Sequence, residues 1–270
     1  MTPALELRGV SKSYARGLLM RRSPPALHPF SLAFLAEEPR IIAVVGESGS
    51  GKSTLGNIIL GFLEPTTGEV RYEGENIWTA SRATRTRFRR DVQAVTQDPF
   101  SAFNPFYKVD HALLVPIRRF RLAASRKAAV ALMEEACAAV GLNPQDTLGR
   151  YPHQLSGGQR QRLMVARALM LRPKILVADE PVSMVDASLR ATILKNVAQL
   201  HRDQSVSVIY ITHDIITAYH IADQVFVLNK GEVVEHGPVE RVIRAPTHPY
   251  TKLLVASIPW PDPDRKWGSG

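Results

Sequence analysis

Residues 46–54 of the chain read Gly46-Glu47-Ser48-Gly49-Ser50-Gly51-Lys52-Ser53-Thr54. The stretch matches the pattern G-x-x-x-x-G-K-[ST], whose glycines let the backbone turn its N–H groups inward around an anion. The run before it, residues 41–45, is short, apolar and rich in β-branched residues, as a buried strand is. After it, apolar residues recur at helical spacing from Leu55 to Phe62. Strand, loop and helix therefore follow one another in the order that a phosphate-binding loop requires.

The residue types in this loop predict how it holds a nucleotide. The helix that follows points its positive end at the phosphates. Lys52 can reach the β- and γ-phosphates as a point charge, and the hydroxyl of Ser53 can bind Mg²⁺. The alternative is a Gly/Ser-rich turn before an ordinary helix, but the motif and its flanks agree on a nucleotide site. The residues expected at the nucleotide are Gly46, Ser48, Gly49, Ser50, Gly51, Lys52, Ser53 and Thr54.

The composition is that of an ordinary soluble globular protein. The 270 residues suffice for one large or two small domains, and 45% of them are hydrophobic and 22% charged. No run approaches the roughly 18 apolar residues of a membrane span, and the N-terminus does not resemble a signal peptide. Cys137 is the single cysteine. We therefore expect no disulfide framework, no cysteine-rich metal site and a cytosolic location.

The net charge of +9 at pH 7 indicates anionic partners. Arginine-rich clusters lie at residues 82–90 and 118–127. They could mark a nucleic-acid surface, solvated helix faces, or a surface attracted to anionic lipid and membrane-protein loops. Because no nucleic-acid recognition motif accompanies the arginines, we expect no nucleic-acid partner.

The hydrophobic patterns predict an α/β fold with two kinds of sheet. Four short apolar runs predict a parallel-sheet core of the P-loop NTPase (RecA-like) kind: residues 41–45, 92–96, 174–179 and 206–212. Alternating stretches predict an antiparallel β layer beside this core: residues 4–8, 30–34, 68–72 and 76–78. Residues 21–25 are expected to form a loop.

Residues 100–170 change in character and predict an inserted α-helical subdomain. They are rich in Ala, Leu and Arg, with hardly any β-branched alternation. Helices are expected at 110–120, 125–140 and 157–171, with breaks at 141–144 and 151–152. Further helices are expected at 81–90 and 187–201, and a hairpin is expected at 224–228 and 232–235. We divide the chain into a main domain, residues 1–245, and a Pro-rich C-terminal extension and tail, residues 246–270.

Polar residues stand where three of the core strands end. Asp179 and Glu180 close the run 174–179, at the edge where doubly wound sheets place ligands. Asp179 would hold Mg²⁺ through water, and Glu180 would orient or activate the attacking water; both could instead be helix N-terminal charges. Gln97 could bind Mg²⁺ or a water, or be a plain loop residue. His213 could touch the γ-phosphate, although a lone histidine is usually structural.

Two further positions have both a functional and a structural interpretation. Tyr14, just after the first strand, could stack on an adenine ring or cover the edge of the antiparallel layer. Ser156 is a plausible N-cap, and the Ser-Gly-Gly run that it begins would expose free N–H groups as a second anion site. An ordinary helix cap is the alternative.

Taken together, these motifs resemble the ATP-binding subunit of an ABC transporter, from about residue 4 to residue 258. Residues 46–54 are similar to the Walker A loop, Gln97 to the Q-loop, and residues 155–159 (Leu-Ser-Gly-Gly-Gln) to the family signature. Residues 175–180 are similar to Walker B with its catalytic glutamate. Residues 183–186 resemble the D-loop, with Met-Val in place of the usual Ala-Leu pair. His213 resembles the switch histidine, and Tyr14 the aromatic residue that stacks on adenine.

The resemblance implies ATP and Mg²⁺ as ligands and a role for each matched residue. It implies catalytic roles for Glu180, His213 and Gln97, and metal ligation by Ser53, Gln97 and Asp179. In this family two ATPase subunits face each other head to tail, and the signature of one closes the Walker A site of the other. The residues that would bind nucleotide in this way are Ser156, Gly157, Gly158, Gln159 and Asp186.

Three stretches are similar to the dipeptide/oligopeptide importer ATPases: residues 45–51, residues 97–105 and the run His248-Pro249-Tyr250-Thr251. This similarity implies peptide import, separate membrane subunits, an extracytoplasmic substrate-binding protein and a peripheral location at the cytoplasmic face of the membrane. Importers for oligosaccharides and nickel share the same ATPase type. Some members carry a C-terminal iron–sulfur cluster, which this chain has no cysteines to hold.

Two other classes of function compete with this interpretation. An ABC-type ATPase acting on nucleic acid or ribosomes would want a coiled-coil insertion, a zinc hook or a second cassette, and none is present. A small-molecule kinase would leave residues 155–159 and His213 without a role. Four aromatic residues, Phe100, Phe103, Phe106 and Tyr107, either form a docking surface for a membrane subunit or belong to the core of the insertion.

Overall fold

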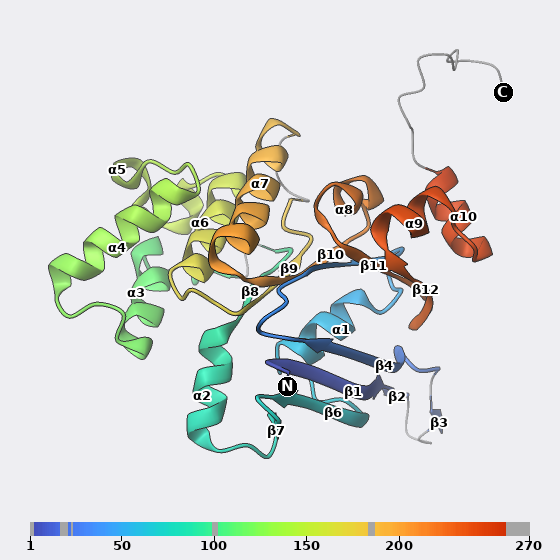
Figure 1. Ribbon diagram of the computed structural model, residues 1–270. Helices are drawn as coiled ribbons and strands as arrows, with labels where there is room; N and C mark the ends of the chain where they lie inside the picture. Colours follow the sequence, from blue (N-terminus) through green and yellow to red (C-terminus); the bar gives the residue numbers. More distant parts are fainter. Residues whose placement is uncertain (1–2, 17–20, 23, 99–101, 183–186, 258–270) are drawn as a thin grey trace, which may run out of the picture.

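Two β-sheets of different kinds organise the chain. A computed structural model describes residues 3–16, 21–22, 24–98, 102–182 and 187–257 (Figure 1). The strands are β1 (Leu5–Lys12), β2 (Ala15–Arg16), β3 (Arg21–Arg22), β4 (Leu27–Phe34), β5 (Ile41–Val45), β6 (Thr67–Tyr72), β7 (Glu75–Asn76), β8 (Val92–Val95), β9 (Ile175–Asp179), β10 (Ser207–Thr212), β11 (Gln224–Asn229) and β12 (Glu232–Pro238). The helices are α1 (Lys52–Ile59), α2 (Arg82–Asp91), α3 (Val109–Phe120), α4 (Arg126–Ala139), α5 (Pro144–Thr147), the 3₁₀ helix η1 (Pro152–Gln154), α6 (Gly157–Leu169), α7 (Ala187–Gln204), α8 (Ile215–Ile221), α9 (Val239–Arg244) and α10 (Pro249–Ala256).

The larger sheet contains the predicted parallel core. Its strand order is β12-β11-β5-β10-β9-β8, and β11, β5, β10, β9 and β8 run parallel. Every residue of β5 and β10 is buried, as their unbroken apolar runs require. The prediction of parallel strands at 41–45, 92–96, 174–179 and 206–212 is confirmed. The hairpin of β11 and β12 was also predicted, but not its place in this sheet, where β12 forms an antiparallel edge.

The smaller sheet is the predicted antiparallel layer, with strand order β4-β1-β6-β7. Two details of the prediction are wrong. Trp78 lies in a turn after β7 rather than in a strand. Arg21 and Arg22, expected in a loop, form β3 and pair with Arg16 and Ala15 of β2. Two-residue strands are too short to show any alternation of apolar and polar side chains, so the sequence carried no signal for them.

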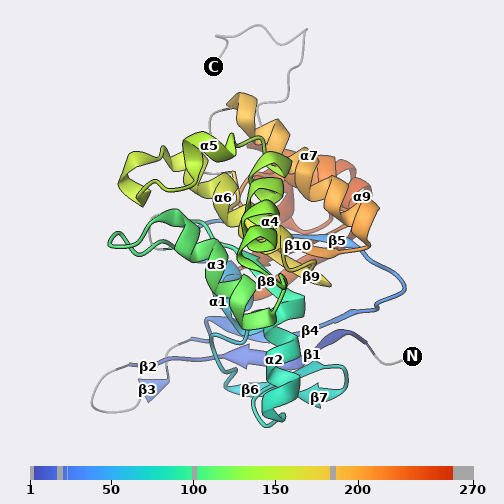
Figure 2. The same cartoon turned by 90° about the vertical axis from the view of Figure 1, so that its left-hand side faces the viewer.

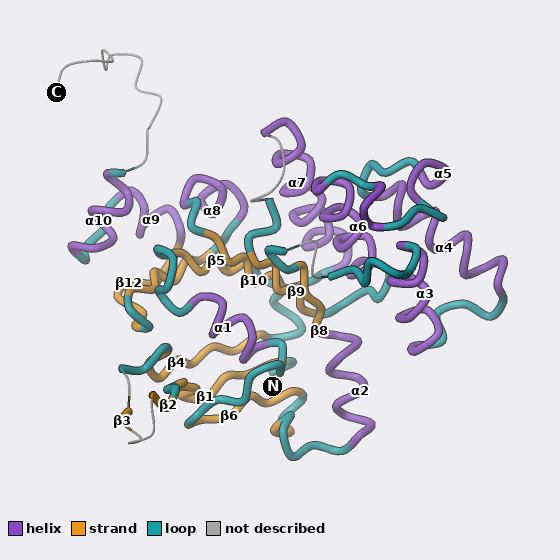
Figure 3. The backbone as a smooth tube through the Cα atoms, turned by 180° about the vertical axis from the view of Figure 1, so that it is seen from behind, coloured by secondary structure: helices purple, strands orange, loops and turns teal. Residues whose placement is uncertain are grey.

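Helix α1 lies between the two sheets, and this explains its apolar face (Figures 1 and 3). Leu55, Ile58 and Ile59 are fully buried in a core that also contains β1, β4 and β6 side chains from one sheet and β5, β9 and β10 side chains from the other. Burial of three large aliphatic side chains contributes roughly 1.5–3 kcal/mol each. The helix that follows the Gly46–Thr54 loop is therefore fixed on two sides.

The inserted helices pack beside the β8 edge of the parallel sheet. Figure 2 shows α3 and α4 in the foreground from that side. None of residues 102–170, all of which the structure describes, lies in a strand, so the predicted helical subdomain is confirmed. A short helix, α5, follows the break expected at 141–144, because Asn143 caps it and Pro144 occupies its first position.

Three helices near the C-terminus were not predicted. They are α8, α9 and α10, the last beginning at Pro249 within the Pro-rich extension, for which no helix was predicted. Proline is favoured at the first helical position, and His248 accepts a hydrogen bond there from the N–H of Tyr250. Among the described residues, no helix combines the length and the apolar character needed to cross a membrane.

Candidate functional site

The loop between β5 and α1 has little room around its backbone. Gly51 adopts a φ of 105°, and a Cβ atom there would lie 2.6 Å from the carbonyl oxygen of Ala26. Only glycine tolerates both the left-handed conformation and this approach. From the other side, the N–H of Gly231, in the β11–β12 turn, donates to the carbonyl of Ser50 over 2.8 Å. Segments far apart in the chain thus hold the loop in shape.

Lys52 turns its side chain back over the loop. Its Nζ donates to the carbonyl oxygens of Gly46 (2.7 Å) and Glu47 (2.8 Å), and the residue is buried. Burial lowers the pKa of Lys52, against the opposing effect of the carboxylates of Glu180 and Asp179. The ammonium group therefore stands at the loop with acceptors that phosphate oxygens could replace.

A cavity of about 210 Å³ opens above the loop. It is lined by Ala26, Ser48, Gly49, Gly51, Lys52, Ser53, Thr54, Gln97 and Glu180. The structure thus brings six of the eight loop residues predicted at the nucleotide together with two of the predicted catalytic residues, Gln97 and Glu180. Nearby, the buried Oγ of Ser50 has no hydrogen-bond partner among the described residues, which leaves a donor available in the loop.

Glu180 is held in a strained and well-defined position at the end of β9. It is a non-glycine residue with a left-handed φ of 45°, and its N–H donates to Ile211 of β10 over 2.9 Å. Gln97 Nε2 donates to its Oε2, and His213 Nδ1 donates to its Oε1, each over 2.9 Å. Gln97 and His213 therefore both contact the carboxylate of Glu180, so the three residues expected to act in catalysis lie together.

Asp179, one residue earlier, supplies the third oxygen donor of the expected metal site. Burial and the neighbouring charge of Glu180 raise the pKa of Asp179 to about 6, against the opposing effect of Lys52. A divalent cation would relieve this unfavourable burial of charge. The hydroxyl of Ser53, the amide oxygen of Gln97 and this carboxylate are hard oxygen donors, so the residues fit Mg²⁺.

The stretch Ser156–Gln159 lies elsewhere, at the start of α6. Ser156 Oγ accepts the N–H of Gln159 (3.2 Å), and Gln159 Oε1 accepts the N–H of Ser156 (2.8 Å). This capping box confirms Ser156 as the N-cap. The expectation of free N–H groups is wrong for Ser156, because the Gln159 side chain reaches back to it. None of Ser156, Gly157, Gly158 and Gln159 lines the cavity above the Gly46–Thr54 loop.

Two other predicted site residues remain, Tyr14 and Asp186. Tyr14 is 47% exposed beyond the end of β1, with Lys12 Nζ 5.6 Å from its ring centre, and it does not line the cavity. Asp186, with the rest of the stretch 183–186, lies outside the described residues.

Two contacts to the site were missed by sequence reasoning. Gln161 is completely buried, and its Nε2 donates to the carbonyl of Glu180 over 3.4 Å. The hydroxyl of Tyr250 accepts the N–H of Glu47 over 3.0 Å. A buried glutamine in a helix has no local sequence signal. The run His248-Pro249-Tyr250-Thr251 indicated similarity to the dipeptide/oligopeptide importer ATPases, but it did not predict a contact with the phosphate loop.

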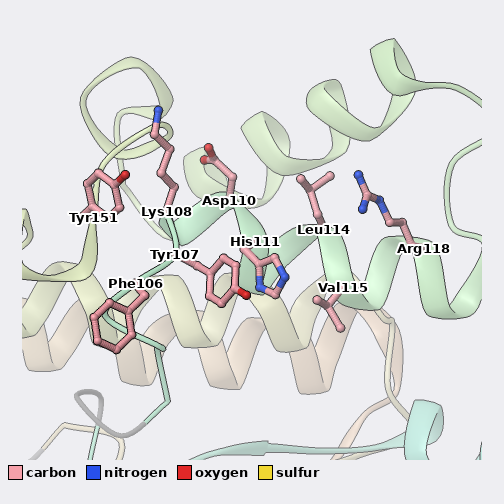
Figure 4. Close-up of a pocket in the computed structure, with 9 residues that line it drawn as sticks. All are labelled: Phe106, Tyr107, Lys108, Asp110, His111, Leu114, Val115, Arg118 and Tyr151. Atoms are coloured by element: carbon pink, nitrogen blue, oxygen red, sulfur yellow. The ribbon is translucent and has the colours of Figure 1, made fainter.

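A separate groove of about 400 Å³ lies on the helical subdomain (Figure 4). Phe106 (85% exposed) and Tyr107 (51% exposed) stand at this groove, where the ring of Tyr107 stacks on His111 with centroids 4.4 Å apart. Phe103 is only 5% exposed and belongs to the core. Phe100 lies outside the described residues. Phe103 thus belongs to the core of the insertion, whereas docking at the exposed rings of Phe106 and Tyr107 stays a prediction.

Comparisons with known sequences agree with this geometry. The sequence model of a family described as "ABC transporter" matches residues 30–183, and one described as "Oligopeptide/dipeptide transporter, C-terminal region" matches residues 234–269. The chain is 40% identical over 233 residues to the putative oligopeptide transport ATP-binding protein YkfD of Bacillus subtilis, an alignment covering 86% of this chain and 70% of that protein. It is 40% identical over 264 residues to the dipeptide transport ATP-binding protein DppF of Haemophilus influenzae, covering 96% and 79%.

A solved structure has the same fold. The ATP-binding cassette MJ0796, in a dimeric post-hydrolysis state bound to ADP and Pi, superposes with a TM-score of 0.77 at 29% identity, covering 87% of this chain and 98% of that one.

Proposed function

Since this chain belongs to the ABC transporter family and is an ATPase of that family, we propose that it powers the import of peptides through separate membrane subunits. The observation that carries the proposal is the convergence of Gln97 and His213 on the carboxylate of Glu180, at the cavity above the Gly46–Thr54 loop. Peptide as the cargo is supported by the names of the relatives and by the C-terminal region matched at residues 234–269.

The loop binds the phosphates of ATP through three kinds of group. The backbone N–H groups around Gly49 and Gly51 form the anion nest, and the positive end of α1 faces it. Lys52 exchanges the carbonyls of Gly46 and Glu47 for phosphate oxygens. Ser53, Gln97 and Asp179 would hold Mg²⁺, which when bound would neutralise charge on the phosphate oxygens.

Glu180 is the residue that receives the proton of the attacking water. One of its carboxylate oxygens accepts a hydrogen bond from Gln97 and the other accepts one from His213, and a carboxylate offers about four lone-pair sites in all, so it can also accept a proton of the water. These two hydrogen bonds fix the orientation of the carboxylate before the nucleotide arrives. Positioning of this kind is the main contribution that a protein makes to phosphoryl transfer.

The assembly that the proposal requires has three further parts. A second ATPase subunit, identical or related, faces this one head to tail, so that residues 156–159 and Asp186 meet its nucleotide. Membrane subunits dock at the groove around Phe106 and Tyr107, and an extracytoplasmic binding protein delivers the peptide to them. The chain is then peripheral at the cytoplasmic face of the membrane, with an ATPase domain at 1–245 and an oligopeptide-type extension at 246–270.

Two substitutions in the purified chain test the chemistry. Glu180→Gln keeps the shape of the side chain and removes its charge, so turnover of ATP should fall at least about 100-fold while ATP binding persists. Lys52→Ala should weaken ATP binding itself. The matched controls are Glu240→Gln, on an exposed side chain, and Lys127→Ala, on the surface of α4. Normal phosphate release by the Glu180→Gln protein would contradict the proposed role.

Uptake of labelled peptides tests the cargo separately. A strain that lacks this chain should lose uptake of dipeptides or longer peptides and regain it with the wild-type chain, but not with the Glu180→Gln chain. Unimpaired peptide uptake in the deleted strain, with loss of oligosaccharide or nickel uptake instead, would reassign the cargo and leave the ATPase intact.

A further inference from the structure

The C-terminal extension reaches the phosphate loop. Tyr250, in the first turn of α10, places its hydroxyl oxygen 3.0 Å from the backbone nitrogen of Glu47, whose N–H donates to it. The two residues are 203 positions apart in the chain. Glu47 is the second residue of the loop, so this contact touches the segment that the proposed function assigns to the nucleotide phosphates.

The other side of Glu47 is already occupied. Its carbonyl oxygen accepts hydrogen bonds from Lys52 Nζ (2.8 Å) and from the N–H of Ser50 (3.2 Å). The peptide groups on both sides of this residue are therefore fixed, the carbonyl by the loop itself and the N–H by the extension. When Lys52 turns to the phosphate oxygens, the carbonyl loses one of its two donors. The hydrogen bond to the hydroxyl of Tyr250 is then one of fewer contacts that fix the backbone of Glu47.

The extension is anchored firmly enough to serve as a brace. Glu235, a buried residue of β12, accepts the N–H of Thr247 (2.9 Å), the hydroxyl of Thr247 (2.8 Å) and the N–H of His248 (3.0 Å). The anchored His248 in turn caps α10 by accepting the N–H of Tyr250 over 3.2 Å. Thr251, the next residue, is fully buried. Tyr250 thus stands between two fixed points, and its hydroxyl has a defined place.

We propose that Tyr250 is a positioning residue for nucleotide binding, whose hydroxyl fixes the Glu47 end of the phosphate loop in its anion-binding shape. The proposal rests on the proposed function in that ATP is the ligand of this loop. It gives the extension a role at the ATP site of its own chain. A tyrosine that only packed against the core would need its ring and not its hydroxyl.

Removal of the Tyr250 hydroxyl alone distinguishes a role in positioning the phosphate loop from a role in packing against the core. Tyr250→Phe keeps the ring, which is half-buried against the core around α8 and α9. The matched control is Tyr219→Phe on α8, where the lost hydroxyl accepts hydrogen bonds from Arg244 (2.8 and 3.2 Å) and does not touch the loop. Tyr250→Ala removes ring and hydroxyl together and measures what the packing contributes.

Three measurements are made on each protein: the Kd and KM for ATP, the kcat at saturation, and the hydrogen exchange of the Glu47 amide without nucleotide. For Tyr250→Phe we expect Kd and KM to rise about fivefold, the value of one ordinary hydrogen bond. We also expect faster exchange at Glu47, an unchanged kcat and an unchanged melting temperature. Tyr250→Ala should show the same rise in KM together with a lower melting temperature. Tyr219→Phe should match the wild type in Kd, KM and Glu47 exchange.

Unchanged KM and unchanged Glu47 exchange in Tyr250→Phe would overturn the proposal, and so would an equal rise of KM in Tyr219→Phe. The exchange measurement needs neither ATP nor turnover. Absence of ATP hydrolysis by the wild-type chain would therefore count against the proposed function, whereas unchanged exchange at Glu47 counts against the role of Tyr250 alone.

Discussion

The side chain of Gln97 donates to the carboxylate of Glu180 over 2.9 Å, although 83 positions separate them in the chain. Gln97 follows β8 and lies just before the helical subdomain, and Glu180 directly follows β9, the first strand after that subdomain. The two ends of the insertion are thus joined at the carboxylate that we propose as catalytic. On that proposal, a displacement of the helical subdomain that pulls on Gln97 would change the orientation of Glu180 and so couple the proposed docking groove to hydrolysis.

Gln97→Ala tests this route in the isolated chain. Without the amide, the carboxylate of Glu180 loses the hydrogen bond that positions its Oε2, so we expect kcat to fall about tenfold, with a smaller change in the affinity for ATP. The control is Gln145→Ala, an exposed glutamine of α5. Equal loss of kcat in both variants would mean that the effect is not specific to the Glu180 contact.

Gly157→Asp tests the head-to-tail assembly. A Cβ atom at Gly157 meets nothing within 4 Å, and an acidic residue in the first turn of α6 suits the positive end of that helix. The fold and the ATP affinity of the single chain should therefore be unchanged. In the Glu180→Gln background, ATP should convert the protein to a dimer, and Gly157→Asp should prevent this by repelling the phosphates of the facing subunit. Size measurements with and without ATP decide the matter, and a dimer that persists in the double variant would contradict the arrangement.

Phe106→Ser tests the docking groove. The ring is 85% exposed, so its loss should leave the melting temperature and the basal ATPase activity unchanged and abolish association with the membrane subunits and transport. Phe103→Ser is the informative contrast. That ring is 5% exposed in the core, and its loss should destabilise the chain by about 3 kcal/mol or more. Full transport activity of the Phe106→Ser protein would place the docking surface elsewhere.

The anchor at Glu235 predicts a dependence of stability on pH. Burial alone would raise the pKa of this carboxyl, but the hydrogen bonds from the N–H groups of Thr247 and His248 outweigh burial and lower the pKa to about 2. A pKa lowered by folding contributes stability that is complete above the ordinary value of 4.5 and is lost as the pH falls towards 2. Denaturant unfolding should show Glu235→Gln less stable than the wild type above pH 4.5, with the difference shrinking on acidification. Glu232→Gln, on an exposed residue of the same strand, is the control; a difference that stays constant with pH would contradict the assignment.

The parts of the structure that the sequence predicted are those in which local pattern and final environment agree. Residues 41–45 and 206–212 are continuous apolar runs because both faces of their sheet are covered. Strands of this kind can be predicted from the run of apolar residues alone. Polar residues directly after such strands meet at one edge, so Gln97, Glu180 and His213 could be expected near one another. The hydrogen bonds from Gln97 and His213 to the Glu180 carboxylate depend on side-chain conformation, which the spacing of residues in the sequence does not predict.

The parts that were missed depend on contacts between distant residues. The contact of Tyr250 with Glu47 joins a helix of eight residues to a loop formed 203 positions earlier. The amide of Ser156 was wrongly expected to be free, although the Ser-x-x-Gln spacing of a capping box is visible at 156–159. The sequence signal was therefore local, and the partner that it indicates for the N–H of Ser156 is the side chain of Gln159.

The place of β5 in the sheet has a consequence for the order in which the protein can be made. β5 carries the phosphate loop, and its sheet partners are β10 and β11, which lie in the last third of the chain. Two more contacts to the loop come from late in the chain: the N–H of Gly231 donates to the carbonyl of Ser50, and the hydroxyl of Tyr250 accepts the N–H of Glu47. During synthesis, a chain shorter than about residue 230 has the complete Gly46–Thr54 motif but lacks the strands that position it. We therefore expect a nascent or truncated chain of this length to lack the shape of the loop that binds phosphates.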